Sequence, residues 1–457
     1  MTIETTNLLD LIGNTPLVEL KSFDVGRCRL LVKLENCNPG GSIKDRIGRS
    51  MIEAAEQQGK LHEGAVLVEA TAGNTGLGLA LVAAQKGYRL VLVIPDKMSQ
   101  EKVFHLKALG AEVIRTRSDV GRGHPQYYQD VAERIAHDTP GAFYVNQFNN
   151  PANPLAHETT TGPEIWRQTG GAVDAVVCGV GSGGTITGLS RYFAQVAPQV
   201  DIVLADPVGS VLAEYVRSGT IGTAGSWLVE GIGEDFVPAI ADLSRVRTAI
   251  EISDLESLTT ARDLLKREGL LAGSSSGTLV AAAVEYCRRQ TEPKNVVTFV
   301  CDSGNKYLSK MYNDFWMADQ GFRSQTFGDL RDVIVRPFVD GSVVSVAPDD
   351  LLHVVYSRMR LHDISQLPVL EGKRIVGIVD ESDVLLAVSR DAAAYREPVS
   401  TFMSTRLETV GRTTPPSALL PILDAGMVAI VADEAGFHGL ITRVDLLNYL
   451  RRQQMAA

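Results

Sequence analysis

The sequence lacks the features that mark disulfide-rich, metal-binding and membrane proteins. Its 457 residues include five cysteines, which are scattered and never stand in a C-x-x-C spacing, so neither a disulfide framework nor a zinc or redox motif is indicated. The longest apolar runs, such as residues 91–94, are far too short to span a bilayer, and the N-terminus has no signal-peptide pattern. We expect a cytoplasmic protein with reduced thiols and no membrane partner.

The sequence has fewer basic than acidic residues, with 44 Lys and Arg residues against 54 Asp and Glu residues. No basic run that would contact phosphate backbones interrupts this balance, so nucleic acid is not expected as a partner. The chain is 45% hydrophobic and 21% charged, which excludes disorder. Its 42 glycines exceed the typical share of about 7%, so some backbone must turn tightly or approach a ligand closely.

Short apolar runs alternate with longer amphipathic ones from about residue 28 to 305. This pattern predicts an α/β fold with two open, mostly parallel lobes covered by helices. We expect an α/β unit over 1–320, a polar linker over 321–330 and a further module over 331–457. The predicted strands are 30–34, 65–69, 89–94, 112–115, 175–180, 202–205 and 296–300, and the predicted helices are 43–58, 75–86, 99–109, 184–195 and 278–289.

The last module contains an internal repeat of the pattern G-apolar-apolar-x-x-x-D. One copy runs from Gly377 to Asp383 and the other from Gly439 to Asp445. Each copy follows an apolar strand and precedes a leucine-rich helix. We therefore expect two units, at about 331–390 and 396–457, that bury a face against each other.

A Pro-Gly-Gly-Ser turn at residues 39–42 opens a predicted helix and places Lys44 in its first turn. The positive field of a helix start lowers the pKa of an amine towards the nucleophilic form. Taken alone, however, Lys44 favours the interpretation of a solvated lysine beside Asp45.

Other turns also follow strands. Residues 71–76 offer hydroxyls suited to a carboxylate, and residues 179–185 offer bare backbone to a phosphate. The second turn contains G-x-G-x-x-G with Asp206 downstream, which keeps dinucleotide binding as a rival, although its donors surround a single phosphate. Residues 273–277 match G-x-S-x-G, but the histidine of an esterase is missing before the repeats, so a Ser/Gly loop that lines a ligand pocket is expected. Ser303 stands at the carboxyl end of a strand, where open α/β sheets bind ligands.

Six motifs in order resemble the fold-type II pyridoxal-phosphate enzymes, and among them the cystathionine β-synthase family with its C-terminal pair of CBS-type (Bateman) repeats. The likeness runs from Leu11 to Trp316 and continues into the repeats. The motifs are GGSIKDR, TAGNTG, NPLAH at 153–157, GSGGT, EGIG at 230–233 and the serine after the last core strand.

The resemblance implies that Lys44 is catalytic and forms a Schiff base with pyridoxal 5′-phosphate, and that Asn74 hydrogen-bonds the 3′ oxygen of the ring. It implies that Ser303 faces the pyridine nitrogen. Ala72 and Glu234 depart from well-known members, which leaves substrate preference open. The implied phosphate ligands are Gly181, Ser182, Gly183, Gly184 and Thr185, and the implied substrate ligands are Thr71, Ala72, Gly73, Thr75, Gln147 and Gly231.

The implied activity is a β-replacement that condenses L-serine with L-homocysteine to L-cystathionine and water, a carbon–oxygen lyase reaction of transsulfuration, with side reactions that produce hydrogen sulfide. One alternative is a cysteine synthase that uses O-acetylserine and sulfide. Another is a nucleotide-sensing protein on an inactive fold. The resemblance also implies a homodimer or homotetramer. We expect no haem, because the sequence starts too close to the catalytic region to hold the haem-binding extension of animal members.

In the repeats, the resemblance implies an adenosyl site at Thr442 and Asp445, the second copy's Thr and Asp. In the first copy Asp380 replaces the hydroxyl, so at most one intact site is implied. Binding of S-adenosylmethionine or another adenosyl effector, and a purely structural or dimerising module, both remain open.

Overall fold

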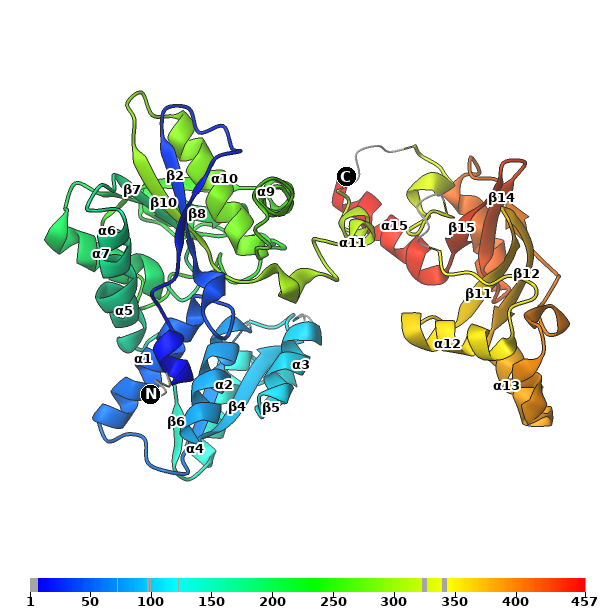
Figure 1. Ribbon diagram of the computed structural model, residues 1–457, viewed down its shortest axis with the longest axis horizontal. Helices are drawn as coiled ribbons and strands as arrows, with labels where there is room; N and C mark the ends of the chain where they lie inside the picture. The colour runs from blue at the N-terminus through cyan, green and yellow to red at the C-terminus, as the bar shows by residue number, and fades with distance from the viewer. Residues whose placement is uncertain are drawn as a thin grey trace, which may run out of the picture. The chain divides into compact units, whose positions relative to one another are not determined.

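The computed structural model describes residues 7–71, 73–96, 98, 100–121, 123–322, 327–338 and 343–456 (Figure 1). The chain divides into two compact units, a larger unit of residues 1–312 and a smaller unit of residues 313–457. The larger unit contains a six-stranded and a four-stranded sheet. The predicted linker at 321–330 falls partly on residues 323–326, which lie outside the described ranges.

The six-stranded sheet has the order β1-β2-β10-β7-β8-β9, in which β1 is antiparallel to β2 and the other neighbours pair in parallel. Its central strands are apolar and buried at nearly every position, as a parallel sheet with helices on both faces requires. The strands are β1 (Leu17–Leu20), β2 (Arg29–Leu34), β7 (Ala175–Cys178), β8 (Asp201–Pro207), β9 (Val246–Ile252) and β10 (Asn295–Val300). In Figure 1, α6 (Gly162–Gln168) and α7 (Gly184–Val196) cover one face, and α9 (Asp254–Glu268) and α10 (Ser274–Arg288) the other.

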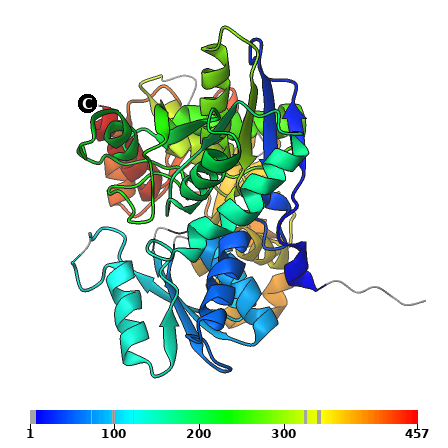
Figure 2. The same ribbon diagram turned by 90° about the vertical axis from the view of Figure 1, so that its left-hand side faces the viewer.

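The four-stranded sheet has the order β5-β4-β3-β6 and is parallel throughout. One face packs against α4 (Tyr128–Asp138), and the other packs against α1 (Lys44–Gln57), α2 (Asn74–Lys86) and α3 (Gln100–Ala108). Figure 2 shows these helices on both sides of the sheet. The strands are β3 (Val66–Ala70), β4 (Arg89–Pro95), β5 (Glu112–Thr116) and β6 (Ala142–Tyr144), and the short helix α5 (Ala152–Ala156) follows.

Two glycines let α1 and α2 cross at backbone contact. A Cβ at Gly48 would lie 2.7 Å from the carbonyl carbon of Gly78, and a Cβ at Gly78 would lie 2.6 Å from the carbonyl oxygen of Lys44. No side chain fits at either position. The crossing therefore brings the first turn of α1 against α2, the helix that Asn74 begins.

The predicted α/β class is confirmed, and each predicted strand and helix of this unit is present. The unpredicted strands are β1, β6 and β9; β6 is three residues long, and exposed charged residues interrupt β9 at the sheet edge. The expectation of a loop at 273–277 is wrong, because α10 begins at Ser274. Its serines serve as acceptors there: Ser274 Oγ accepts from the Glu230 amide (3.0 Å) and Ser276 Oγ from the Cys301 amide (2.9 Å).

The smaller unit repeats a hairpin followed by a helix. In one copy β11 (Gln366–Glu371) and β12 (Arg374–Asp380) precede α13 (Glu381–Arg390). In the other, β14 (Ala429–Asp433) and β15 (Gly436–Ile441) precede α15 (Arg443–Ala456), and β13 (Thr409–Val410) pairs in parallel with β14. The remaining helices are α11 (Asp314–Asp319), α12 (Leu352–His362) and α14 (Leu420–Asp424).

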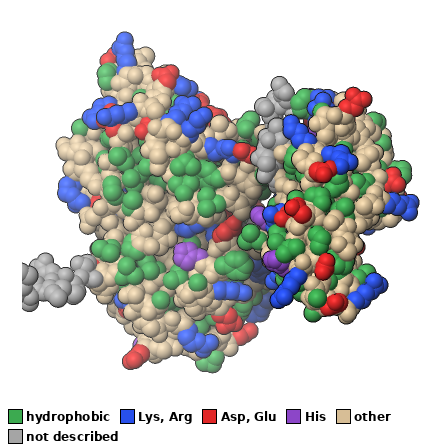
Figure 3. Space-filling view, turned by 45° about the vertical axis from the view of Figure 1, so that its right-hand side comes forward, with side chains coloured by type: hydrophobic (Ala, Val, Ile, Leu, Met, Phe, Trp, Pro, Cys, Tyr) green, Lys and Arg blue, Asp and Glu red, His purple; other side chains and the backbone are tan. Residues whose placement is uncertain are grey.

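None of the helices formed by the described residues is both long and apolar enough to cross a membrane. Acidic and basic side chains are interspersed over the face drawn in Figure 3.

Candidate active site

Lys44 is the first residue of α1, and the turn before it is tied to the end of β10. The Ile43 amide donates to the Cys301 carbonyl (2.9 Å), and the Ser303 amide donates to the Gly41 carbonyl (3.1 Å). Gly41 has φ +75°, a left-handed conformation that favours glycine. Backbone hydrogen bonds therefore bring Lys44 close to Ser303, although more than 250 residues separate the two in the sequence.

Burial lowers the pKa of the Lys44 amine, although the neighbouring Cys301, Asp302 and Glu234 act in the opposite direction. The start of α1 adds the positive end of a helix dipole, which also disfavours the ammonium. Both influences favour a neutral amine, the form that attacks a carbonyl.

The GSGGT turn is a cradle of bare backbone between β7 and α7. A Cβ at Gly181 would lie 2.5 Å from the Gly231 carbonyl oxygen, one at Gly183 would lie 2.5 Å from Ala241 Cβ, and one at Gly184 would lie 1.8 Å from Asn153 Oδ1. Gly183 also has φ +90°. Among the described residues, no acceptor is present for the amides of Gly184, Thr185 and Ile186, which open α7. These amides form an anion site of the kind that holds phosphate.

Asn153 and His157 line this cradle from α5 and the π-helical turn after it. Asn153 Nδ2 donates to Ser182 Oγ (2.9 Å), and His157 Nε2 lies 3.3 Å from Thr185 Oγ1. Burial and the nearby Lys44 and Arg46 hold the pKa of His157 well below its ordinary value. The histidine is therefore neutral, and the donors of the cradle are backbone amides and hydroxyls.

The TAGNTG turn begins at the carboxyl end of β3 and ends in α2. Thr75 Oγ1 donates to Gln147 Oε1 (2.6 Å), and the Gly73 amide donates to Thr71 Oγ1 (3.2 Å). Gly73 has φ +128°, so the turn needs glycine there. The predicted ligands Thr71, Gly73, Thr75 and Gln147 are therefore gathered at one place, while Ala72 lies outside the described residues.

Gly231 adjoins the phosphate cradle, since its carbonyl oxygen is the atom that leaves no room for a side chain at Gly181. The preceding Glu230 receives ion pairs from Lys102 (2.6 Å) and Lys310 (2.7 Å). Burial would raise the pKa of Glu230, but the two ammonium groups hold it below its ordinary value. Because Lys102 belongs to α3, this cluster joins the two lobes.

Asn74 begins α2 and is half-buried. Its Nδ2 donates to Asp302 Oδ2 (2.7 Å), and its Oδ1 accepts from Lys306 Nζ (3.0 Å). Ser303 caps the short 3₁₀ helix after β10 and accepts from the Asn305 amide (3.3 Å). Asn74 and the segment carrying Ser303 thus meet at Asp302.

Thr442 and Asp445 belong to the smaller unit, at the start of α15. The Thr442 amide and hydroxyl both donate to Asp445 Oδ2, each at 2.6 Å. In the other repeat Asp380 and Asp383 form a capping box at the start of α13. The two pairs occupy equivalent positions, and the second copy combines a hydroxyl with a carboxylate.

Asp302, Lys306, Tyr307, Asn153 and His157 were given no role in the sequence prediction. Asp302 directly precedes Ser303 at the carboxyl end of a strand, so its position in the sequence could have indicated a place in the site. Lys306 follows in the turn after that strand end, and no spacing rule links it to Asn74.

These residues fit pyridoxal phosphate. A nucleophilic lysine, a glycine cradle with free amides and a hydroxyl at a strand end are the donor set that an aldehyde, a phosphate and a pyridine nitrogen require. The close approach of backbone and side chains that a Cβ at Gly181, Gly183 or Gly184 would block is the observation that carries this fit. No cluster of three or more metal-binding side chains occurs in the described part of the chain.

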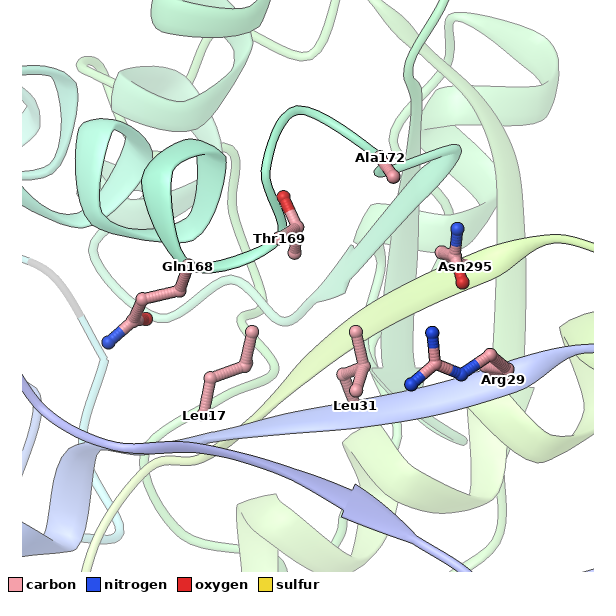
Figure 4. Close-up of a pocket in the computed structure, with 7 residues that line it drawn as sticks. All are labelled: Leu17, Arg29, Leu31, Gln168, Thr169, Ala172 and Asn295. Carbon is pink, nitrogen blue, oxygen red and sulfur yellow. The ribbon is translucent and has the colours of Figure 1, made fainter.

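A hollow of about 340 Å³ is lined by residues of β1, β2 and β10 and of the end of α6 and the turn after it (Figure 4). Arg29 and Asn295 begin β2 and β10, so this pocket opens at the amino ends of those strands, away from the ends that ligands occupy. Its lining residues are Leu17, Arg29, Leu31, Gln168, Thr169, Ala172 and Asn295.

Residues 8–302 match the family of pyridoxal-phosphate dependent enzymes, and residues 330–390 and 399–452 match CBS domains. The chain is 35% identical to a cystathionine beta-synthase of Dictyostelium discoideum over 98% of its own length and 93% of that protein. It is 44% identical to cysteine synthase A of Escherichia coli over 65% of its length and 92% of that protein. The crystal structure of an O-acetylserine dependent cystathionine beta-synthase from Helicobacter pylori matches 68% of this chain and 99% of its own, at 35% identity and a TM-score of 0.62. The chain therefore belongs to the cystathionine β-synthase family of pyridoxal-phosphate dependent enzymes, with two C-terminal CBS domains.

Proposed function

We propose that this protein condenses L-serine with L-homocysteine to L-cystathionine and water. The observation that carries the proposal is the similarity to a cystathionine beta-synthase over 98% of the chain, repeats included. The larger unit supports it with three features. Burial lowers the pKa of the Lys44 amine, the GSGGT turn offers a cradle for a phosphate, and the TAGNTG turn offers hydroxyls for a substrate carboxylate.

Bound pyridoxal phosphate supplies an electron sink for the α-carbon of the amino acid. We assign Lys44 to hold the cofactor and then to move the proton at that carbon. Thr71, Thr75 and Gln147 bind the substrate carboxylate, and Gly181 to Thr185 hold the phosphate. The Ser303 hydroxyl would hold the pyridine nitrogen. A hydroxyl, unlike a carboxylate, would not keep that nitrogen protonated, so the electron sink that the cofactor supplies would be a moderated one.

The test is product analysis with serine or O-acetylserine as donor and homocysteine or sulfide as acceptor. Cystathionine from serine plus homocysteine at the highest kcat/KM supports the proposal. Lys44→Ala is the control, because it keeps the cradle and removes the amine. Turnover of O-acetylserine plus sulfide alone would overturn the assignment.

A cysteine synthase is the second candidate, supported by the 44% identity to the Escherichia coli enzyme. A hydrogen sulfide-producing enzyme from Fusobacterium nucleatum also matches at 35% identity and a TM-score of 0.62. The same Lys44 chemistry serves either donor and acceptor, so release of sulfide as a side reaction is part of the proposal.

For the smaller unit we propose one adenosyl-ligand site, at Thr442 and Asp445. The support is their hydroxyl and carboxylate pair, which Asp380 and Asp383 do not reproduce. Calorimetry with S-adenosylmethionine tests it, with Asp445→Ala as the matched variant. Absence of heat with the unaltered protein would leave a structural module.

We also propose a cytoplasmic homodimer or homotetramer. Leu361, Leu385 and Leu447 are largely exposed on the smaller unit, at 79%, 69% and 64%, and burial of such side chains favours association. Light scattering after size exclusion gives the mass of the particle, and a monomer at micromolar concentration would contradict the proposal.

A further inference from the structure

The side-chain amide of Asn74 is held at both of its ends. Nδ2 donates to Asp302 Oδ2 at 2.7 Å, and Oδ1 accepts from Lys306 Nζ at 3.0 Å. A carboxylate cannot donate and an ammonium cannot accept, so these two partners determine which end of the amide is which. One Nδ2 hydrogen remains, and no described residue accepts from it. The only ligand atom that Asn74 can serve there is an acceptor.

Lys306 connects this amide to the turn that carries the catalytic lysine. Its Nζ lies 3.3 Å from the Gly41 carbonyl oxygen and 3.4 Å from that of Gly40, in addition to Asn74 Oδ1. Its three hydrogens are thereby used, and the residue is only 7% exposed. Burial lowers the pKa of Lys306, while the neighbouring Asp302 acts in the opposite direction. As an ammonium that donates to three acceptors, Lys306 has no lone pair with which to attack a carbonyl, so we assign it the role of holding its partners.

Asp302 is equally constrained. Its Oδ2 also accepts from the Tyr307 hydroxyl at 2.8 Å, and a Cβ at Gly273 would lie 1.8 Å from its Oδ1. The carboxylate is 1% exposed and faces the Lys306 ammonium, which offsets part of the free-energy cost of burying both charges. The amide of Asn74 therefore lies between two fixed, oppositely charged groups.

We propose that Lys306 and Asp302 are positioning residues that turn the remaining N–H of Asn74 towards the 3′ oxygen of pyridoxal phosphate. The inference rests on the proposed function, since it requires that the cofactor binds. A hydrogen bond from the ammonium to Oδ1 also polarises the amide and strengthens its donation from Nδ2. This donation stabilises the ionised form of the 3′ oxygen.

The test is spectroscopic and uses the full-length protein with bound cofactor. Lys306→Met keeps most of the side-chain volume and removes the donors. We expect the visible absorption of the cofactor to fall in favour of near-ultraviolet absorption. The dissociation constant for pyridoxal phosphate should rise about three- to tenfold, the loss of about one ordinary hydrogen bond between Asn74 and the cofactor. Lys60→Met, at an exposed lysine after α1, is the matched control and should leave both unchanged.

A double-mutant cycle separates positioning from general support of the turn at residues 40–41. If Lys306 acts through Asn74, then Asn74→Ala and Asn74→Ala/Lys306→Met have the same spectrum and the same affinity. A further shift in the double variant, or a Lys306→Met spectrum equal to that of Lys60→Met, would overturn the inference. If circular dichroism shows that Lys306→Met does not fold, Lys306→Gln replaces it. Glutamine keeps a neutral amide donor group with two N–H bonds, so we expect a smaller shift of the same sign.

Failure of the proposed function has a different signature. In that case the unaltered protein would acquire no cofactor mass on Lys44 after borohydride reduction, and both proposals would fall together. If the unaltered protein is labelled and the Lys306 variants keep its spectrum, the inference alone fails.

Discussion

The backbone of Lys44 lies against Gly78. A Cβ at residue 78 would meet the Lys44 carbonyl oxygen at 2.6 Å and its carbonyl carbon at 2.9 Å. The position of Lys44, the proposed catalytic lysine, thus depends on a residue in the middle of α2 that contributes no functional group.

Gly78→Ala is expected to push α1 away from α2, since neither partner atom belongs to a flexible side chain. Overpacking of this kind costs about 1–3 kcal/mol of stability. Displacement of the Lys44 turn should also reduce the fraction of protein that borohydride labels with cofactor. Gly121→Ala is the control, because a Cβ there has nothing within 4 Å. Equal denaturation midpoints and equal labelling of the two variants would contradict the prediction.

Gly184→Ala tests the phosphate cradle. The added Cβ would lie 1.8 Å from Asn153 Oδ1, and Asn153 also donates to Ser182 and to the Gln147 carbonyl. The side chain has to move, which disturbs the cradle and the carboxylate turn together. We expect affinity for pyridoxal phosphate to fall by at least about tenfold, measured by equilibrium dialysis, a loss of roughly 1.4 kcal/mol. Unchanged affinity would show that the cradle does not hold the phosphate.

The sequence predicted glycine-containing turns that open helices at the candidate site, whereas the roles of their residues came from the family resemblance and stay predictions. Glycine stands shortly before or at the start of a helix in three places, which are the turn before Lys44, the turn at residues 71–75 and the turn at residues 181–185. Each of these combinations can be recognised within a stretch of about ten residues of the sequence. Asp302 and Lys306 were missed because their partner Asn74 is more than 220 residues away in the sequence. They meet because the turn before α1 is hydrogen-bonded to the segment after β10, while α1 crosses α2, the helix that Asn74 begins. The edge strand β9 was missed because exposed charged residues interrupt its apolar pattern. It forms a strand because it pairs in parallel with β8, and that pairing is not visible in the local sequence.

Glu69 predicts a dependence of stability on pH. Burial raises the pKa of this carboxyl to about 8 from an ordinary value of 4.5, although the amides of Gln147, Ala70 and Asn146 oppose the shift. The folded state therefore holds a proton that the unfolded state releases, and the stability this contributes is full below about pH 4.5 and is lost as the pH rises to about 8. Glu69→Gln keeps an acceptor for the Gln147 amide without a charge.

Urea denaturation across that pH range checks the expectation for Glu69. The free energy of unfolding of Glu69→Gln should fall less steeply with pH than that of the unaltered protein. Parallel slopes would show that Glu69 is ionised in the folded state. Asp45 and Asp206, whose pKa values burial raises to about 7 and about 6, contribute a slope of the same sign in both proteins and cancel in the comparison.

Lys102 and Lys86 form ion pairs of nearly equal length but unequal burial. Lys102 Nζ lies 2.6 Å from Glu230 with a side chain 2% exposed, whereas Lys86 Nζ lies 2.7 Å from Glu56 with a side chain 24% exposed. Removing one partner of a buried pair costs about 3–5 kcal/mol, while a solvated pair contributes less than about 1 kcal/mol. Because Glu230 keeps Lys310, we expect Lys102→Met to cost about 3 kcal/mol and Lys86→Met to cost under about 1 kcal/mol in urea denaturation. Lys102 joins α3 to the Glu230 turn of the other lobe. Equal losses of stability for the two variants would therefore mean that the Lys102 pair does not help to hold the lobes together.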